Sequence, residues 1–262
     1  MAPDPSRLAA VETGAGPRLV LAHGFTQNAG CWGRFGTRLA RTHRLVAVDL
    51  PGHGASGPAV GDLPDAGRRL VATGGPAAYL GYSLGGRVCL HAAVAHPDQV
   101  RRLVLVSTTA GLRAAEERAA RRAVDAAWAD ELDPPGGGGD AAGRLDRFLD
   151  RWLAQPLFAT LPTDSAEVAA RRRNDPAGLA SSLRTGGVGT QEPLWDRLEA
   201  LTMPVLVVVG AADRRYTDLG RQLVEAVGPT ASLAAIAGAG HACHLERPER
   251  VAAVVTDFLA DG

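Results

Sequence analysis

The feature that most constrains the fold is a series of short apolar runs, bounded by glycine and proline, that recurs along the chain. Runs this short and this continuously apolar indicate strands buried on both faces, hence a parallel sheet covered by helices. Stretches of helical period lie between most of them, and this alternation predicts an α/β fold with a mostly parallel, doubly wound sheet. The runs are Arg18 to Ala22, Leu45 to Asp49, Ala77 to Gly81, Leu103 to Ser107, Val205 to Gly210 and Ser232 to Ala237, and the helical stretches include Arg87 to Ala95, Leu219 to Val227 and Pro248 to Leu259.

The middle of the chain has a different pattern, because strand-like runs disappear and stretches rich in Ala, Arg and Glu replace them. We therefore expect a core formed by residues 1–110 and 196–262, with a helical cap of residues 111–195 inserted in it. A glycine run within Asp133 to Asp140 predicts a break between cap helices. The expected cap helices are Ala114 to Leu132, Ala142 to Ala154, Ser165 to Arg173 and Pro176 to Arg184.

Charge and composition narrow the class of partner. The 262-residue chain has a formal net charge of zero and no basic stripe, which argues against nucleic acid and favours a small molecule. All 28 basic residues are arginine, so any single arginine is weaker evidence for anion recognition than usual. The oligomeric state is left open.

The cysteines and the apolar segments bear on localisation. Cys31, Cys89 and Cys243 are an odd number at unrelated spacings, which is typical of reduced thiols. Neither a signal-peptide-like apolar stretch at Met1 to Glu12 nor a membrane-length apolar run is present. We expect a cytoplasmic protein that does not enter a membrane.

One pentapeptide predicts the catalytic nucleophile. Gly81-Tyr82-Ser83-Leu84-Gly85 follows a strand-like run and opens an amphipathic stretch, the context in which a G-x-S-x-G sequence forms a nucleophile elbow. Small residues let the chain turn sharply and lift the Ser83 hydroxyl above the sheet edge. A serine hydroxyl is a poor nucleophile or base until an imidazole takes its proton and a carboxylate orients that imidazole.

The C-terminal part of the chain contains a candidate carboxylate and a candidate imidazole for Ser83. Along the chain they follow in the order Ser, acid, His, as in the α/β arrangement of such sites. The buried run Val205 to Gly210 leads to Asp213, and the next strand-like run leads to His241. Both residues are expected at the carboxyl edge of the sheet, where α/β sites lie. We therefore predict a Ser83–His241–Asp213 triad. For each partner the alternative is an ordinary loop residue.

An oxyanion hole needs two backbone N–H groups aimed at one point. In this arrangement one belongs to the residue after the nucleophile, Leu84, and the other to the loop after an early strand, which makes Phe25 the second candidate. The remaining histidines are interpreted as turn or helix-surface residues. None forms a metal-ligand spacing with a cysteine or carboxylate, so we expect no metal and no cofactor.

These segments together resemble the α/β-hydrolase superfamily. The narrower resemblance is to 2-succinyl-6-hydroxy-2,4-cyclohexadiene-1-carboxylate synthase of the menaquinone pathway, and it includes the cap, which diverges quickly among unrelated hydrolases. One departure is the short, glycine-rich stretch Gly57 to Pro76, where that family has a longer helical connection. The segments that carry the resemblance are HGF, DLPGHGAS, GYSLGGR, ERAAR, QPLFATL, RNDPAGLASSLRTGGVGTQEPLW and HACHLERPE.

The resemblance implies a carbon–oxygen lyase that removes pyruvate from 2-succinyl-5-enolpyruvyl-6-hydroxy-3-cyclohexene-1-carboxylate, with Ser83 as the base. Counting back from GLA favours Arg171 over the adjacent Arg172 and Arg173 as one substrate ligand. For each cap arginine the alternative is a solvated helix face, and for the aromatic residues it is packing. The implied substrate-binding residues are Tyr82, Arg87, Arg121, Trp152 and Arg171.

The residues themselves support an anionic substrate, because Arg87 lies one helical turn after Ser83 and three carboxylates need cationic partners. Two other functions remain open. The first is a serine-triad hydrolase, a carboxylesterase or carbon–carbon-bond hydrolase, acting on a small anionic substrate. The second is a binding protein of the same fold without catalysis, whose signature would be a missing triad residue.

Overall fold

A parallel sheet dominates the computed structural model, which describes residues 4–58, 61–136, 139–162 and 166–260. Among these residues seven strands form one sheet in the order β1-β3-β2-β4-β5-β6-β7. Only β1 is antiparallel to its neighbour, β3; the other neighbouring strands are parallel. The strands are β1 (Ala10–Thr13), β2 (Arg18–Ala22), β3 (Arg44–Val48), β4 (Ala77–Tyr82), β5 (Val100–Val106), β6 (Val205–Gly210) and β7 (Ala231–Ile236).

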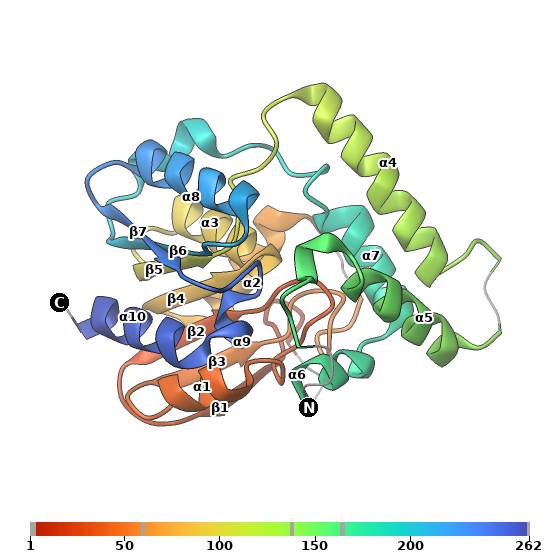
Figure 1. The fold of residues 1–262 in the computed structure, drawn as a ribbon, viewed down its shortest axis with the longest axis horizontal. Coiled ribbons are helices and arrows are strands. Elements are labelled where there is room, and N and C mark those ends of the chain that lie inside the picture. The colour runs from red at the N-terminus through yellow and green to blue at the C-terminus, as the bar shows by residue number, and fades with distance from the viewer. Residues whose placement is uncertain (1–3, 59–60, 137–138, 163–165, 261–262) are drawn as a thin grey trace.

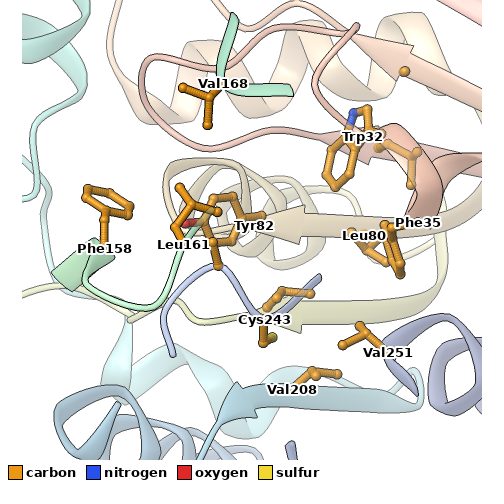
Figure 2. Close-up of a cluster of buried hydrophobic side chains, with 14 of the residues drawn as sticks. Trp32, Phe35, Leu80, Tyr82, Phe158, Leu161, Val168, Val208, Cys243 and Val251 are labelled. Atoms are coloured by element: carbon orange, nitrogen blue, oxygen red, sulfur yellow. The ribbon is translucent and has the colours of Figure 1, made fainter. Parts of the chain in front are cut away.

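Both faces of the sheet are buried, because side chains alternate between two hydrophobic clusters. Leu19 and Leu21 of β2 point into one cluster, and Val20 points into the other. The first cluster is covered by helices α1 (Gly33–Leu39) and α10 (Pro248–Ala260), and Figure 2 shows part of it. The second is covered by α2 (Leu63–Gly74), α3 (Leu84–Ala95) and α8 (Arg214–Val227). The predicted doubly wound α/β architecture is confirmed.

The described residues between β5 and β6 form helices joined by loops, with no strand among them. It packs beside the sheet, and α4, α5 and α7 lie together at the right of Figure 1. Buried cap residues such as Phe148, Trp152 and Leu179 join the first hydrophobic cluster of the core. The elements of this segment are α4 (Ala115–Leu132), α5 (Ala141–Leu153), η1 (Pro156–Phe158), α6 (Ala166–Ala169), η2 (Ala170–Arg173) and α7 (Pro176–Gly186), and η3 (Trp195–Ala200) follows it.

The structure differs from the sequence-based expectation in several elements. The stretch Gly57 to Pro76 contains a full helix, α2, whose N-terminus is capped by the Asp62 side chain. Strand β1 and helix α1 were not expected from the sequence. The expected helix Ser165 to Arg173 is split into α6 and η2, and Ser165 lies outside the described residues, as do residues 137–138 of the expected break.

Candidate active site

The strand-to-helix turn between β4 and α3 presents Ser83. Its backbone has φ 51° and ψ −106°, a conformation that non-glycine residues rarely adopt. The turn also presses against β2, since a Cβ on Gly85 would lie 1.9 Å from the Ala22 carbonyl oxygen. A hydrogen bond of 2.7 Å from the Thr108 hydroxyl to the Ser83 carbonyl oxygen anchors the turn. The glycines of the pentapeptide are therefore required by close backbone approach, and the serine is held in a strained, fixed position.

Ser83, His241 and Asp213 come together at the carboxyl edge of the sheet. The Ser83 Oγ lies 3.3 Å from His241 Nε2, and His241 Nδ1 lies 3.1 Å from Asp213 Oδ2. The imidazole is 1% exposed, and the Asp213 side chain is 9% exposed. The distances suit a relay in which the carboxylate fixes the imidazole and the imidazole accepts the serine proton.

Two neighbours that sequence reasoning did not identify hold the triad. The Glu246 carboxylate accepts hydrogen bonds from the Gly240 N–H (2.6 Å) and the Ala242 N–H (3.1 Å), on either side of His241. The Tyr216 N–H donates to Asp213 Oδ1 at 3.1 Å. The only sequence signal was the position of each residue, a few places after the triad residue it supports.

The candidate oxyanion N–H groups belong to Phe25 and Leu84, which both line the cavity at Ser83. Leu84 is the first residue of α3, so its N–H has no intrahelical acceptor. No described residue accepts a hydrogen bond from the Phe25 N–H. Both groups are therefore free to bind a developing oxyanion.

The loop that carries Phe25 is braced by residues beneath it. The His23 ring bridges two loops, with Nδ1 2.8 Å from the Gly24 carbonyl oxygen and Nε2 accepting from the Leu50 N–H at 3.0 Å. Gly24 lies directly on the Tyr82 ring, because a Cβ there would be 2.5 Å from it. His23 and Tyr82 thus fix the height of the candidate oxyanion hole.

A cavity opens beside Ser83 between the sheet edge and the cap. Of the residues predicted from sequence, the structure brings all but Asp213 and Arg171 to its wall. Asp213 lies behind His241, which is where a triad carboxylate is expected. The predicted residues on the wall are Phe25, Tyr82, Ser83, Leu84, Arg87, Arg121, Trp152 and His241.

The two cavity arginines are held by different partners. Arg87 is buried, and its Nη1 donates to the Gly186 carbonyl oxygen at 2.8 Å. Burial lowers the pKa of Arg87 to about 10, so the guanidinium stays charged at neutral pH. Arg121 is half-buried, and its Nε lies 2.8 Å from the buried Asp125 carboxylate. Each arginine therefore offers a fixed cation to the cavity.

Arg171 occupies a different place from the one expected of a substrate ligand. It is 1% exposed, whereas Arg172 and Arg173 are exposed, and it is absent from the cavity wall. Its Nη1 donates to the Thr26 hydroxyl and, at 3.4 Å, to the Phe25 carbonyl oxygen. Burial lowers the pKa of Arg171. The guanidinium therefore supports the oxyanion loop from behind.

The two predicted aromatic residues pack as well as line the cavity. The Trp152 ring stacks on Phe148 with centroids 5.7 Å apart and contacts Phe25 at 5.0 Å. The centroid of the Tyr82 ring lies 4.3 Å from that of His244 and 5.4 Å from that of His241. Tyr82 belongs to the same hydrophobic cluster as Leu161 and Phe158 of the cap, part of which Figure 2 shows. Both side chains therefore join the hydrophobic cluster to the site.

Several other histidines are more buried than the sequence suggested. His43 and His91 were expected on helix surfaces, yet they are 7% exposed. His53 and His244 are also buried. Burial lowers the pKa of His91 to about 4.

Within the described ranges, no group of His, Cys, Asp and Glu side chains is arranged to hold a metal ion, and no helix has both the length and the apolarity needed to span a membrane.

Comparison with known proteins agrees with this geometry. A sequence model described as the alpha/beta hydrolase family matches residues 19–254. The chain belongs to the alpha/beta hydrolase family. The family and the fold class predicted from the sequence are thus confirmed.

Within this family the chain is similar to several proteins that share the same enzyme name. It is 34% identical to 2-succinyl-6-hydroxy-2,4-cyclohexadiene-1-carboxylate synthase of Klebsiella pneumoniae strain 342, over 96% of this chain and 98% of that protein. The protein of that name from Serratia proteamaculans is 32% identical over 94% of each chain. The solved structure of MenH from S. aureus superposes with a TM-score of 0.85 and 25% identity, covering 97% of both chains. The narrower resemblance seen in the sequence is confirmed.

Proposed function

We propose that this alpha/beta hydrolase-fold enzyme eliminates pyruvate from 2-succinyl-5-enolpyruvyl-6-hydroxy-3-cyclohexene-1-carboxylate in menaquinone biosynthesis. The product is 2-succinyl-6-hydroxy-2,4-cyclohexadiene-1-carboxylate, the compound in the name of the relatives. The reaction is a lyase reaction, so no water enters the product. We place it in the cytoplasm with a small anionic substrate as its only reaction partner.

The observation that carries the proposal is the presence of two fixed cations beside the nucleophile. Arg87 and Arg121 line the same cavity as Ser83. A substrate with three carboxylates needs such partners, because a buried carboxylate without a cation is strongly destabilised. A general esterase has no need of two arginines at this point. The anion-binding wall therefore favours the tricarboxylate over a neutral ester.

Proton transfer begins at the triad. His241 takes the Ser83 proton, and the Ser83 oxygen removes a proton from the ring carbon next to the succinyl ketone. Asp213 stabilises the imidazolium that forms. The electrons released at carbon first form an enolate and then shift through the ring double bond, so that the carbon–oxygen bond to the enolpyruvyl group breaks. The departing enolate takes up a proton at carbon and becomes pyruvate.

The enolate oxygen is the point at which charge develops, and we assign the N–H groups of Phe25 and Leu84 to it. The α3 N-terminus adds its positive dipole end at the same place. Donors that are already in position cost no reorganisation during the reaction. Arg171, behind the Phe25 loop, fixes one of them and adds a positive charge in a region of low polarity.

A paired assay tests the function. Pyruvate release from the enolpyruvyl substrate is followed by coupling to lactate dehydrogenase, and p-nitrophenyl acetate is offered separately as an ester. The lyase mechanism predicts pyruvate release, slow ester turnover and no acyl-enzyme burst. Rapid ester turnover without pyruvate would support the second candidate, a carboxylesterase or carbon–carbon-bond hydrolase, which the complete Ser83–His241–Asp213 arrangement also allows.

A further inference from the structure

Tyr216 lies against the triad, and the reaction steps proposed above assign no role to its side chain. It lies in the first turn of α8, three residues after Asp213, which is the N-cap of that helix. Its ring lies against the His241 imidazole with centroids 4.3 Å apart, and its backbone N–H binds Asp213. The residue therefore touches two members of the triad through separate groups.

Tyr216 lines two neighbouring cavities. One is the cavity at Ser83, and the other is a neighbouring cavity lined by Arg113 and Arg215. Tyr216 belongs to the wall between them. The residues that line both cavities are Thr109, Arg121, Gln155, Leu157, Val188 and Tyr216.

The surroundings of the hydroxyl are cationic. Burial raises the pKa of Tyr216, and the charges of Arg215, Arg87 and Arg121 oppose that rise only in part. The hydroxyl thus keeps its proton at neutral pH and remains a donor. No described residue forms a hydrogen bond with it. A half-buried donor without a partner, surrounded by arginines, is suited to an anionic oxygen.

Building on the lyase function above, we propose that Tyr216 is a further substrate-binding residue, whose hydroxyl donates a hydrogen bond to a substrate carboxylate held at Arg87 and Arg121. The need for it follows from the position of Arg171. That arginine supports the oxyanion loop and does not reach the cavity wall. Among the described residues, two arginines line the cavity at Ser83, whereas the substrate has three carboxylates, and a neutral donor supplies part of the missing recognition.

Two variants separate the hydroxyl from the ring. Tyr216→Phe keeps the ring against His241 and removes only the donor. We expect KM for pyruvate release to rise about tenfold to a hundredfold, the range for a hydrogen bond to a charged group, with kcat within about threefold of wild type. Tyr216→Leu also removes the ring, so we expect kcat to fall as well.

Tyr79→Phe is the matched control. Its hydroxyl is likewise a tyrosine donor, but it binds the Gly75 carbonyl oxygen at the opposite end of β4. This variant should lose thermal stability and keep the wild-type KM. An unchanged KM in Tyr216→Phe, or an equal rise in KM in Tyr79→Phe, would overturn the proposal.

A binding measurement keeps this proposal distinct from the proposed function. Benzene-1,2,4-tricarboxylate, which cannot react, is titrated into wild type and Tyr216→Phe by calorimetry. We expect the Kd of the variant to be about tenfold or more weaker. Equal Kd values, or no binding to wild type, would contradict Tyr216 as a carboxylate ligand. Failure of wild type to release pyruvate would instead contradict the lyase function.

Discussion

The Arg171 guanidinium donates a hydrogen bond to the Thr26 hydroxyl, which joins the cap to the loop that carries Phe25. Thr26 has a positive φ of 68°, so the loop is held in a conformation that threonine adopts at a cost. The Arg171 Nε and Nη2 have no hydrogen-bond partner among the described residues. A buried cation this poorly paired contributes little net stability, and its value lies in the loop that it fixes.

Arg171→Met tests this relationship, because methionine keeps the apolar stem and removes the charge. We expect pyruvate release to fall roughly tenfold to a hundredfold, since the oxyanion donor loses its support. The free energy of unfolding, from urea denaturation, should change by less than about 2 kcal/mol, because loss of the bond to Thr26 and relief of the buried charge oppose each other.

The neighbouring Arg172→Met is the control. Arg172 is exposed and pairs with Asp146 at 2.7 Å on the cap surface. It should leave both activity and stability close to wild type, since surface ion pairs contribute about 0–1 kcal/mol. A large stability loss in Arg171→Met with full activity would make Arg171 a packing residue.

Anion recognition is tested at Arg87, the arginine nearest to the nucleophile in sequence. Arg87→Ala leaves a substrate carboxylate unpaired in the cavity, which costs roughly 2 to 5 kcal/mol by analogy with truncated buried charge pairs. We expect kcat/KM for pyruvate release to fall by tens to thousands of fold. Arg250→Ala, at an exposed position of α10, should change it by less than about threefold. If the two variants behave alike, the tricarboxylate substrate loses its main support.

Acid sensitivity is expected from buried histidines. Burial lowers the pKa of His23 to about 4, and of His53 and His244 to about 3, from an ordinary value of 6.5. Below pH 6.5 the unfolded chain therefore binds protons that the folded chain does not, so the free energy of unfolding falls as pH decreases from there toward 4. Each histidine contributes about 1.4 kcal/mol per pH unit in this window.

Urea denaturation between pH 7.5 and pH 5 measures that slope. His53→Gln should reduce the slope, because one buried imidazole no longer titrates. Arg250→Gln, at an exposed position of α10, is the control and should leave the slope close to wild type. A wild-type free energy of unfolding that stays constant over this range would contradict the expectation.

The inner strands were predictable because burial on both faces leaves an apolar run in the sequence. Strand β1 was missed because all four of its residues are exposed, so it has no such signature. Helix α2 was missed although its signals are present: Asp62 at the N-cap and a proline in the first turn. The glycines around these signals are typical of a loop, so the stretch was not predicted as a helix.

The part of the site that could be predicted is the part for which a short motif identifies the residue and also indicates where it lies in the fold. The elbow motif and the order of the strand-like runs along the chain predicted Ser83, Asp213 and His241 as a set, and the structure places them within hydrogen-bonding distance. Tyr216 and Glu246 act through a ring contact and through backbone N–H groups, which depend on how distant segments pack. No sequence pattern shows how these segments pack against each other. For the same reason, no pattern shows that Arg171 lies behind the loop that carries Phe25.

The most direct test of the account is pyruvate release by wild type and by Ser83→Ala, measured with the same enolpyruvyl substrate. The Ser83 side chain is half-buried and contributes little packing, so the variant should keep its melting temperature. We expect wild type to release one pyruvate per substrate and Ser83→Ala to be slower by several orders of magnitude. A folded Ser83→Ala that keeps more than about a tenth of the wild-type rate would contradict it, because removing a triad residue does not permit such activity.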